Sequence, residues 1–316
     1  MRVSISIDVD TIGRDPFVRQ TSETLAKGLR LSWDRSLPRL IDFLEKRKVS
    51  ATFFIVAEDA RRNPSWVRSL IKAGHEIASH SLTHPKQLSS LSKTEIRREI
   101  VESKKILEDV SQRPVLGFRT PGYKLSHTIF ETLEEAGYVY DASLNLSIPY
   151  NTIKWLVRYL IPATKRAYIF VERPRLKRRP LAYRPSKADY TKPALGVSEG
   201  YNVLEIPIFL LNWIHWPMAS SLFQLLGPRI AGRLVKVFCG KAPFVPIELH
   251  DFEFVQRSDY LEVYGSYSRW GLLQFLGINI NRSGQHVIDA ILSSFDNPEY
   301  VVMQEIPSLL GQLGER

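Results

Sequence analysis

Short apolar runs alternate with amphipathic segments along the first 145 residues of this 316-residue chain. The runs over 3–9, 51–56, 75–79, 115–118 and 138–141 predict strands. The segments over 37–48, 64–73, 93–111 and 126–136 predict helices. Strands that alternate with helices in this way predict a parallel sheet with right-handed crossovers, either doubly wound or closed into a barrel.

The regular alternation stops after residue 145. Residues 146–200 form a basic, proline-containing segment, and residues 208–240 are apolar and aromatic. Further strands are predicted over 202–208, 243–249 and 300–303, and a further helix over 283–295. We therefore expect a single α/β domain over residues 1–316, in which two insertions interrupt a barrel.

The positive charge of the chain is concentrated in the first insertion. The chain has 43 Lys and Arg against 33 Asp and Glu, a formal charge of +10. Residues 154–187 hold 11 of the basic side chains and one acid, which leaves 32 of each sign elsewhere. A local patch indicates an anionic partner, but no nucleic-acid recognition motif accompanies it. The alternatives are a solvated arm or an anionic membrane surface that contacts Lys177, Arg178 and Arg179.

The second insertion leaves a similar choice open. Trp213 and Trp216 lie in a nearly uncharged stretch that Asn212, His215 and Pro217 interrupt, so it does not predict a transmembrane span. Tryptophans followed by cations are typical of a segment that lies at a membrane interface. The alternative is a helical excursion that covers the barrel.

The single cysteine excludes a disulfide framework and a cysteine-based zinc module. No basic stretch followed by an apolar run opens the sequence, so no signal peptide is predicted. We therefore expect a cytoplasmic protein, peripheral at the inner face of the membrane. Asp8-Val-Asp10 stands where a glycine-rich loop would follow the first strand, which disfavours a nucleotide-binding fold.

Acidic and imidazole side chains cluster where the predicted strands end. Asp8 and Asp10 are two positions apart, so both carboxylates point to the same side of the strand. His80 and His84 follow the third strand at a spacing that would place both rings on one side of a helical turn. The C-terminal ends of parallel strands meet at one face of an α/β fold. One carboxylate and two imidazoles there predict a site for one divalent metal, with zinc first and Co, Mn, Ni or Fe as alternatives.

Two further motifs complete a resemblance to a known family. Arg119-Thr-Pro121-Gly-Tyr123 follows the fourth strand, and Leu249-His250 ends a late strand. With the Asp-x-Asp and His-x-x-x-His motifs, and in this order, they resemble the polysaccharide deacetylases, the NodB-type carbohydrate esterases of family four. The Asp-x-Asp spacing resembles a subgroup that includes peptidoglycan and lipid-linked aminosugar deacylases.

The resemblance implies a distorted (β/α)7-type barrel and a role for each matched residue. The residues that would hold the metal are Asp10, His80 and His84. Asp8 would be the general base that activates the attacking water, and Arg119 would pair with Asp8. His250 would be the general acid that protonates the leaving amine.

The same resemblance places Pro121, Tyr123 and Asp141 on the substrate side of the site. The fourth motif departs from the family pattern, because the stretch from Asp141 to Asn145 offers no evident partner for His250. The partner of the general acid therefore stays open.

These observations predict a metal-dependent hydrolase that removes an N-acetyl or N-formyl group from an amino sugar. The favoured substrate is carried on a polyprenyl phosphate or a similar lipid at the cytoplasmic membrane face. One alternative is deacetylation of a polymer such as chitin, an exopolysaccharide or peptidoglycan. The other is a glycan- or membrane-binding module without catalysis, which has no need of a base, a metal triad and an acid together.

Overall fold

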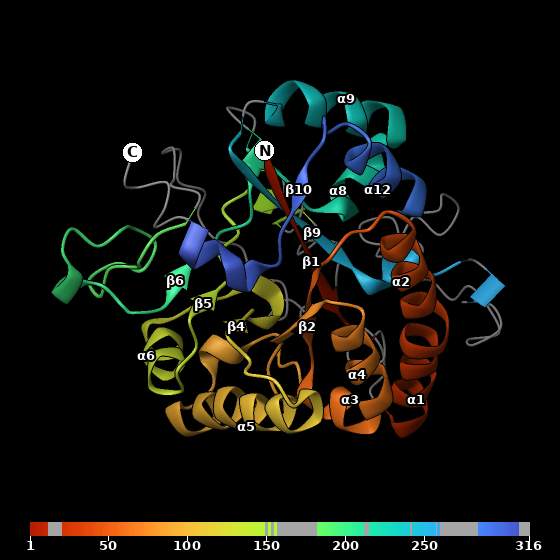
Figure 1. Ribbon diagram of the computed structural model, residues 1–316. Helices are drawn as coiled ribbons and strands as arrows, with labels where there is room; N and C mark the ends of the chain where they lie inside the picture. Colours follow the sequence, from red (N-terminus) through yellow and green to blue (C-terminus); the bar gives the residue numbers. More distant parts are fainter. Residues whose placement is uncertain are drawn as a thin grey trace.

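The computed structural model describes residues 1–11, 21–148, 151–152, 155–156, 182–211, 215–240, 242–256, 258–259 and 284–309. In these ranges the chain forms a parallel sheet that curls into a barrel, with helices around it (Figure 1). The membrane contacts predicted for Lys177, Arg178, Arg179 and Trp213 lie outside the described residues.

Among the described residues, seven parallel strands follow one another in the order β9-β1-β2-β3-β4-β5-β6. Their bounds are β1 Arg2–Val9, β2 Thr52–Ile55, β3 Glu76–Ser79, β4 Gly117–Phe118, β5 Tyr140–Asp141, β6 Leu204–Glu205 and β9 Phe244–His250. A further strand, β10 (Glu299–Tyr300), pairs with the start of β1. Each strand expected from the sequence is thus present, several of them only two residues long.

Strand β1 lies between β9 and β2 and is buried from Val3 to Val9. Strand β9 pairs with it over Arg2–Asp8, and β2 pairs with it from Ser6 onward. Along β1, Val3, Ile5 and Ile7 belong to the main hydrophobic core, whereas Ser6 and Asp8 meet a buried arginine. The alternation of side chains along a strand therefore separates the packing face from a polar face.

A short hairpin connects the two ends of this sheet. It consists of β7 (Leu210–Leu211) and β8 (Trp216–Pro217), which pair antiparallel. The backbone N–H of Met218 donates to the carbonyl of Phe209 at 2.7 Å, and the N–H of Glu248 donates to the carbonyl of Met218 at 2.8 Å. The start of the second insertion thus links the β6 segment to β9, which explains why this stretch is apolar.

The helices cover the outside of the barrel. Their bounds are α1 Ser22–Leu31, α2 Leu37–Lys46, α3 Ala57–Arg62, α4 Pro64–Lys72, α5 Lys93–Ser111, α6 His127–Glu135, α8 Ser220–Leu226, α9 Pro228–Cys239 and α12 Gly284–Leu292. Short 3-10 turns are η3 Leu88–Ser90, η4 Pro121–Tyr123, η6 Val197–Glu199, η7 Asp251–Phe254 and η8 Met303–Glu305, and a π-helical turn, η2 Ser32–Ser36, joins α1 to α2. The five helices expected from the sequence are present. Helices α1 and α3 were not expected.

The rest of the second insertion packs on the barrel as α8 and α9 (Figure 1). Helix α9 buries Ala231, Val235 and Cys239 and runs so close to α12 that a Cβ at Gly232 would lie 3.0 Å from the carbonyl oxygen of Ala290. This is the covering arrangement that the sequence left open. No helix in the described part of the chain is long and apolar enough to cross a membrane.

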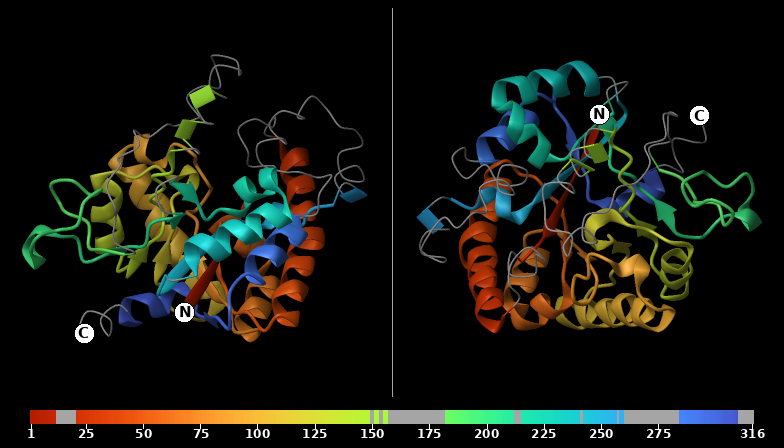
Figure 2. Two further views of the ribbon diagram at one scale, coloured as in Figure 1. Left: turned by 90° about the horizontal axis from the view of Figure 1, so that it is seen from above. Right: turned by 180° about the vertical axis from the view of Figure 1, so that it is seen from behind.

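The C-terminal segment covers the end of the barrel at which the strands begin. Glu76, the first residue of β3, accepts hydrogen bonds from Thr52 Oγ1 at 2.6 Å, Tyr140 Oη at 2.8 Å and the N–H of Gln304 at 3.0 Å. Seen from above, the C-terminal segment drawn in blue lies on the same side of the molecule as the N-terminus (Figure 2, left). This leaves the ends of the strands on the other side for the candidate site.

Candidate active site

Three predicted metal ligands meet beyond the ends of β1 and β3. The Nε2 atoms of His80 and His84 lie 3.2 Å and 3.1 Å from Asp10 Oδ1. The two imidazole centroids are 4.9 Å apart, and both rings are buried. The structure thus brings together one carboxylate and two imidazoles, although the carboxylate lies 70 or more residues from either histidine in the sequence.

The two histidines do not lie on a helical turn, so that expectation was wrong. Residues 80–85 form an irregular loop in which Ser81 and His84 both have φ near +65°. Glu99 of α5 holds this loop by accepting hydrogen bonds from the N–H groups of Leu82 at 3.0 Å and Thr83 at 2.9 Å. In a helix, the backbone N–H groups of this loop would bond to carbonyls of the same helix. Here the buried Glu99 carboxylate accepts them instead, so the loop can take the irregular shape that brings the two rings together.

The donor set fits a divalent metal. His80 Nδ1 is 2.8 Å from the carbonyl oxygen of Arg119, which directs Nε2 toward Asp10. Such a second contact fixes the ring orientation of a metal-binding histidine. Asp10 Oδ1 and His84 Nε2 are buried and make no hydrogen bond of good geometry to any described residue. Burial opposes ionisation of Asp10, yet the two imidazoles hold its pKa well below the usual value. An ion bound here would satisfy these atoms.

Asp8 and Arg119 form a buried ion pair beside this triad. Arg119 Nη1 lies 2.6 Å from Asp8 Oδ1, and both side chains are 2% exposed. Arg119 also donates to the carbonyl of Ala142 at 2.7 Å and to Ser6 Oγ at 2.9 Å, and its guanidinium lies 4.1 Å from the ring centroid of Phe54. The guanidinium is therefore fixed, and it fixes the orientation of the Asp8 carboxylate.

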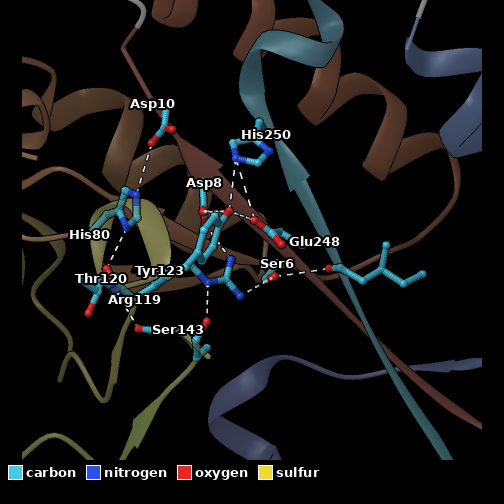
Figure 3. A network of polar contacts seen from close by, with 12 residues as sticks. Ser6, Asp8, Asp10, His80, Arg119, Thr120, Tyr123, Ser143, Glu248 and His250 are labelled. Carbon is cyan, nitrogen blue, oxygen red and sulfur yellow. Dashed lines mark hydrogen bonds and ion pairs between the residues drawn. The ribbon is translucent and has the colours of Figure 1, made fainter. Parts of the chain in front are cut away.

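Tyr123 and His250 approach the same carboxylate from two other elements. Tyr123 Oη lies 3.3 Å from Asp8 Oδ2 and 3.4 Å from His250 Nε2 (Figure 3). His250 stands opposite Asp8 in the β1–β9 register and stacks on Phe252 with centroids 4.7 Å apart. The structure thus places the predicted base, the predicted acid and a tyrosine hydroxyl within one cluster.

The sequence reasoning missed Glu248 in this cluster. Glu248 is buried and accepts a hydrogen bond from Tyr123 Oη, and its Oε1 is 3.8 Å from His250 Nε2. The signal that could have found it is its position two residues before His250, on the same side of the strand.

Asp141 and Pro121 lie behind the cluster. Asp141 is fully buried and accepts a 2.7 Å hydrogen bond from Ser143 Oγ, which in turn accepts from the N–H of Thr120 at 2.8 Å. Burial raises the pKa of Asp141, whose carboxyl is next to that of Glu205. Pro121, also buried, opens the η4 turn that carries Tyr123. These positions support the segment from Arg119 to Tyr123, and their contact with substrate stays a prediction.

Trp216, predicted at a membrane interface, lies in β8. Its ring packs edge-on against Phe223 of α8 with centroids 6.3 Å apart, and the side chain is half-buried. This contact ties the hairpin to the helices that cover the barrel. In this structure Trp216 therefore acts as a packing residue.

Comparisons with known proteins give the same family as the motifs. Residues 24–140 match the polysaccharide deacetylase family. Over 101 residues the chain is 37% identical to a peptidoglycan-N-acetylglucosamine deacetylase of Bacillus cereus and 30% identical to a chitooligosaccharide deacetylase of Sinorhizobium fredii. Each match covers 32% of this chain and 46% of the relative. The chain therefore spans about half the length of the curated relatives it matches.

A solved structure from Pseudomonas aeruginosa PAO1, described as a polysaccharide deacetylase, is similar over almost the whole chain. The TM-score is 0.57 at 17% sequence identity, over 96% of this chain and 89% of that chain. At this identity the likeness concerns the fold. It confirms the predicted distorted (β/α)7-type barrel.

Proposed function

Residues 24–140 belong to the polysaccharide deacetylase family, and we propose that this chain is a metal-dependent hydrolase that removes an N-acetyl group from an amino sugar. One observation carries the proposal. A donor set for a divalent metal, a carboxylate fixed by an arginine and a largely buried histidine, His250, converge at the same ends of the strands. Amide hydrolysis needs these three functions together.

The residues that would hold the metal are Asp10, His80 and His84, with zinc the first choice for this donor set. A divalent metal there would supply Lewis acidity, which polarises the amide carbonyl and eases deprotonation of water. The backbone carbonyl of Arg119 orients one of these ligands, His80, through its contact with Nδ1. Loss of this contact would weaken binding of the metal rather than the fold.

The remaining chemistry belongs to the side chains of the chain. Asp8 Oδ2 faces the cluster and would accept a proton from the attacking water, while Oδ1 stays paired with Arg119. His250 would donate a proton to the amine nitrogen as the carbonyl carbon–nitrogen bond breaks. Arg119 is held at four places and would therefore keep the base in one orientation throughout the reaction.

The substrate we propose is an N-acetylated amino sugar of the glucosamine type. The two curated relatives named above are a peptidoglycan-N-acetylglucosamine deacetylase and a chitooligosaccharide deacetylase, which supports an N-acetylglucosamine unit. We further propose that the sugar is presented on a lipid at an anionic membrane, at its cytoplasmic face. The basic segment 154–187 and the cationic outer face of α9 support this form of the substrate. A free glycan polymer is the alternative form.

The proposal is tested by incubating the purified, zinc-loaded protein with chitin oligomers, peptidoglycan fragments and a polyprenyl-phosphate-linked N-acetylated sugar. Mass spectrometry would show the loss of one acetyl group from the substrate, and acetate release would give the rate. We expect turnover of at least one of these substrates, and a rate lower by on the order of 10²-fold with Asp8→Asn at matched metal content. Binding of all three without any loss of acetyl would favour the non-catalytic alternative and would contradict the proposed function.

A further inference from the structure

A second carboxyl group lies beside the proposed general acid on β9. Glu248 and His250 stand opposite Ser6 and Asp8 in the β1–β9 register, so the two side chains leave β9 on the same side. Glu248 is only 3% exposed. Figure 3 shows Glu248 and His250 both directed at the hydroxyl of Tyr123.

The Tyr123 hydroxyl connects these two groups. It donates a hydrogen bond to Glu248 Oε1 and lies 3.4 Å from His250 Nε2. The direct distance between Glu248 Oε1 and His250 Nε2 is 3.8 Å, which is too long for a hydrogen bond. Glu248 Oε2 is buried and makes no hydrogen bond within the described part of the chain. Among the described residues, the phenol is thus the group that bridges the carboxyl and the imidazole.

The surroundings shift the pKa values of Glu248 and His250 in opposite directions. Burial lowers the pKa of His250, so the imidazole by itself is a weak source of protons at neutral pH. Burial and then the neighbouring Asp8 carboxylate raise the pKa of Glu248 well above its usual value. The charged and titratable groups that face this pair are Asp8 of β1, Asp10 beyond β1, His80 beyond β3, Arg119 beyond β4, Tyr123 of η4 and Glu253 of η7. Both shifts favour the uncharged forms, a protonated carboxyl beside a neutral imidazole.

We propose that Glu248 is the proton-holding partner of His250 and that the Tyr123 hydroxyl relays the proton between them. The inference rests on the proposed function, in which His250 protonates the leaving amine. As the carbonyl carbon–nitrogen bond breaks, Nε2 gives its proton to the amine nitrogen. When Glu248 holds its proton on Oε1, this O–H donates to the Tyr123 oxygen and the phenol turns its own O–H toward Nε2, so in the same step the phenol passes its proton to Nε2 and receives the proton of Glu248. The proton that Asp8 took from the attacking water then returns from Asp8 Oδ2 through the same hydroxyl to Glu248 Oε1, so the protein gains and loses none per turnover.

A second metal is a poorer interpretation of the same cluster. Ligand atoms of Asp8, Glu248 and His250 lie within 4.8 Å of one another, as a metal would require. However, the Arg119 guanidinium is 2.6 Å from Asp8 Oδ1, so a cation among these atoms would face a fixed positive charge. The tyrosine hydroxyl also bonds the carboxylate that would have to coordinate the ion.

The experiment compares an amide with an ester whose leaving group needs no proton. Zinc-loaded wild type, Glu248→Gln and Tyr123→Phe would be assayed on N-acetylated chitin oligomers and on 4-nitrophenyl acetate. We expect the amide rate of Glu248→Gln to fall roughly tenfold or more relative to its ester rate, since only the amine must be protonated to leave. Tyr123→Phe should change the ratio in the same direction. An equal loss of both rates would overturn the proposal.

The pH dependence gives a second readout. Without Glu248 the imidazole keeps its proton only at lower pH, so the alkaline limb of kcat/KM for the amide should move to lower pH. The deficit of Glu248→Gln should shrink as the solution is acidified, and Glu248→Asp should recover part of the rate. If the alkaline limb of Glu248→Gln stays at the wild-type pH, Glu248 does not hold the proton. If Glu248→Gln loses one equivalent of metal, the residue supports the metal site instead, which would also contradict the proposal.

Glu76→Gln is the matched control. Glu76 is also a buried glutamate bonded to a tyrosine hydroxyl, but it lies at the opposite end of the barrel. Its ratio of amide to ester rates should equal that of the wild type. A wild type inactive on every N-acetylated sugar would overturn the proposed function itself, whereas an active wild type with an unchanged ratio in Glu248→Gln would overturn only the relay.

Discussion

Asp8 and Asp10 are separated by one residue, yet the fold gives them different neighbours. Asp10 faces two imidazoles, whereas Asp8 is paired with Arg119 and bonded by Tyr123. A carboxylate whose lone pairs are already directed by a guanidinium and a phenol is less available to a metal. Two acids of the same strand end can therefore serve as ligand and base.

This difference predicts separate effects of two substitutions. Asp8→Asn should keep one equivalent of metal and lower turnover by on the order of 10²-fold, because only the proton acceptor is removed. His80→Ala should lose both metal and activity while the fold remains. Elemental analysis of the purified variants beside their acetate release rates measures both. Loss of metal from Asp8→Asn would instead make Asp8 a ligand.

At the scale of elements, packing inside the barrel depends on close approach between neighbouring strands. A Cβ at Gly117 of β4 would lie 2.0 Å from Cζ of Tyr140 on β5, so only glycine leaves space for this ring. The ring in turn places its hydroxyl on Glu76 of β3, which the η8 turn also contacts. The C-terminal segment is thus joined to the barrel through one buried glutamate.

Glu76 makes the stability of this junction depend on pH. Burial raises its pKa from 4.5 to about 7. Because the folded state binds this proton more tightly, the stabilisation is complete below pH 4.5 and is lost as the pH rises toward 7. A shift of this size corresponds to on the order of 3 kcal/mol at most.

Glu76→Gln removes the titrating group and isolates its contribution. The free energy of unfolding of the wild type minus that of Glu76→Gln, from denaturant titrations, should fall by up to about 3 kcal/mol between pH 5 and pH 8. Other buried carboxyl groups, such as Asp251, cancel in this difference. A difference that does not change with pH would mean that Glu76 is ionised in the folded protein throughout.

At the scale of the whole molecule, α9 presents a face suited to an anionic surface. Arg229, Arg233 and Lys236 are exposed on it and make no ion pair with another described residue, and the helix contains no acid. Ile230 and Val237 of the same helix are 50% and 74% exposed and lie next to Arg229 and Lys236 in the sequence. Cations beside exposed apolar side chains are typical of helices that lie on anionic membranes.

We therefore predict that the protein sediments with anionic liposomes, less with neutral ones, and less as salt rises. Replacing Arg229, Arg233 and Lys236 by glutamine should weaken binding by on the order of 10²-fold, at about 1 kcal/mol for each cation. The control replaces Lys93, Arg97 and Lys105 of α5, which are already paired with glutamates. If both triple variants bind like the wild type, α9 does not contact the lipid.

The sequence by itself determined the order of the elements and most of the residues of the site. Periodicity and the alternation of apolar runs are local properties, so they located eight of the strands and five of the helices in the described part of the chain. The motif residues were equally accessible, because strand ends in a parallel sheet converge on one face whatever the lengths of the connections. That is why Asp10, His80 and His84 could be grouped before any distance was known.

Only the tertiary structure decided which groups touch. Glu99 supports the histidine loop from α5, and Glu248 meets Tyr123 across the barrel, although neither belongs to a recognised motif. Such contacts depend on the register between β1 and β9 and on how a hairpin at Met218 closes the sheet. The register joins residues about 240 positions apart, and no short-range pattern records it. For the same reason the sequence left open whether its apolar insertion covers the barrel, which the packing of α9 on α12 answers.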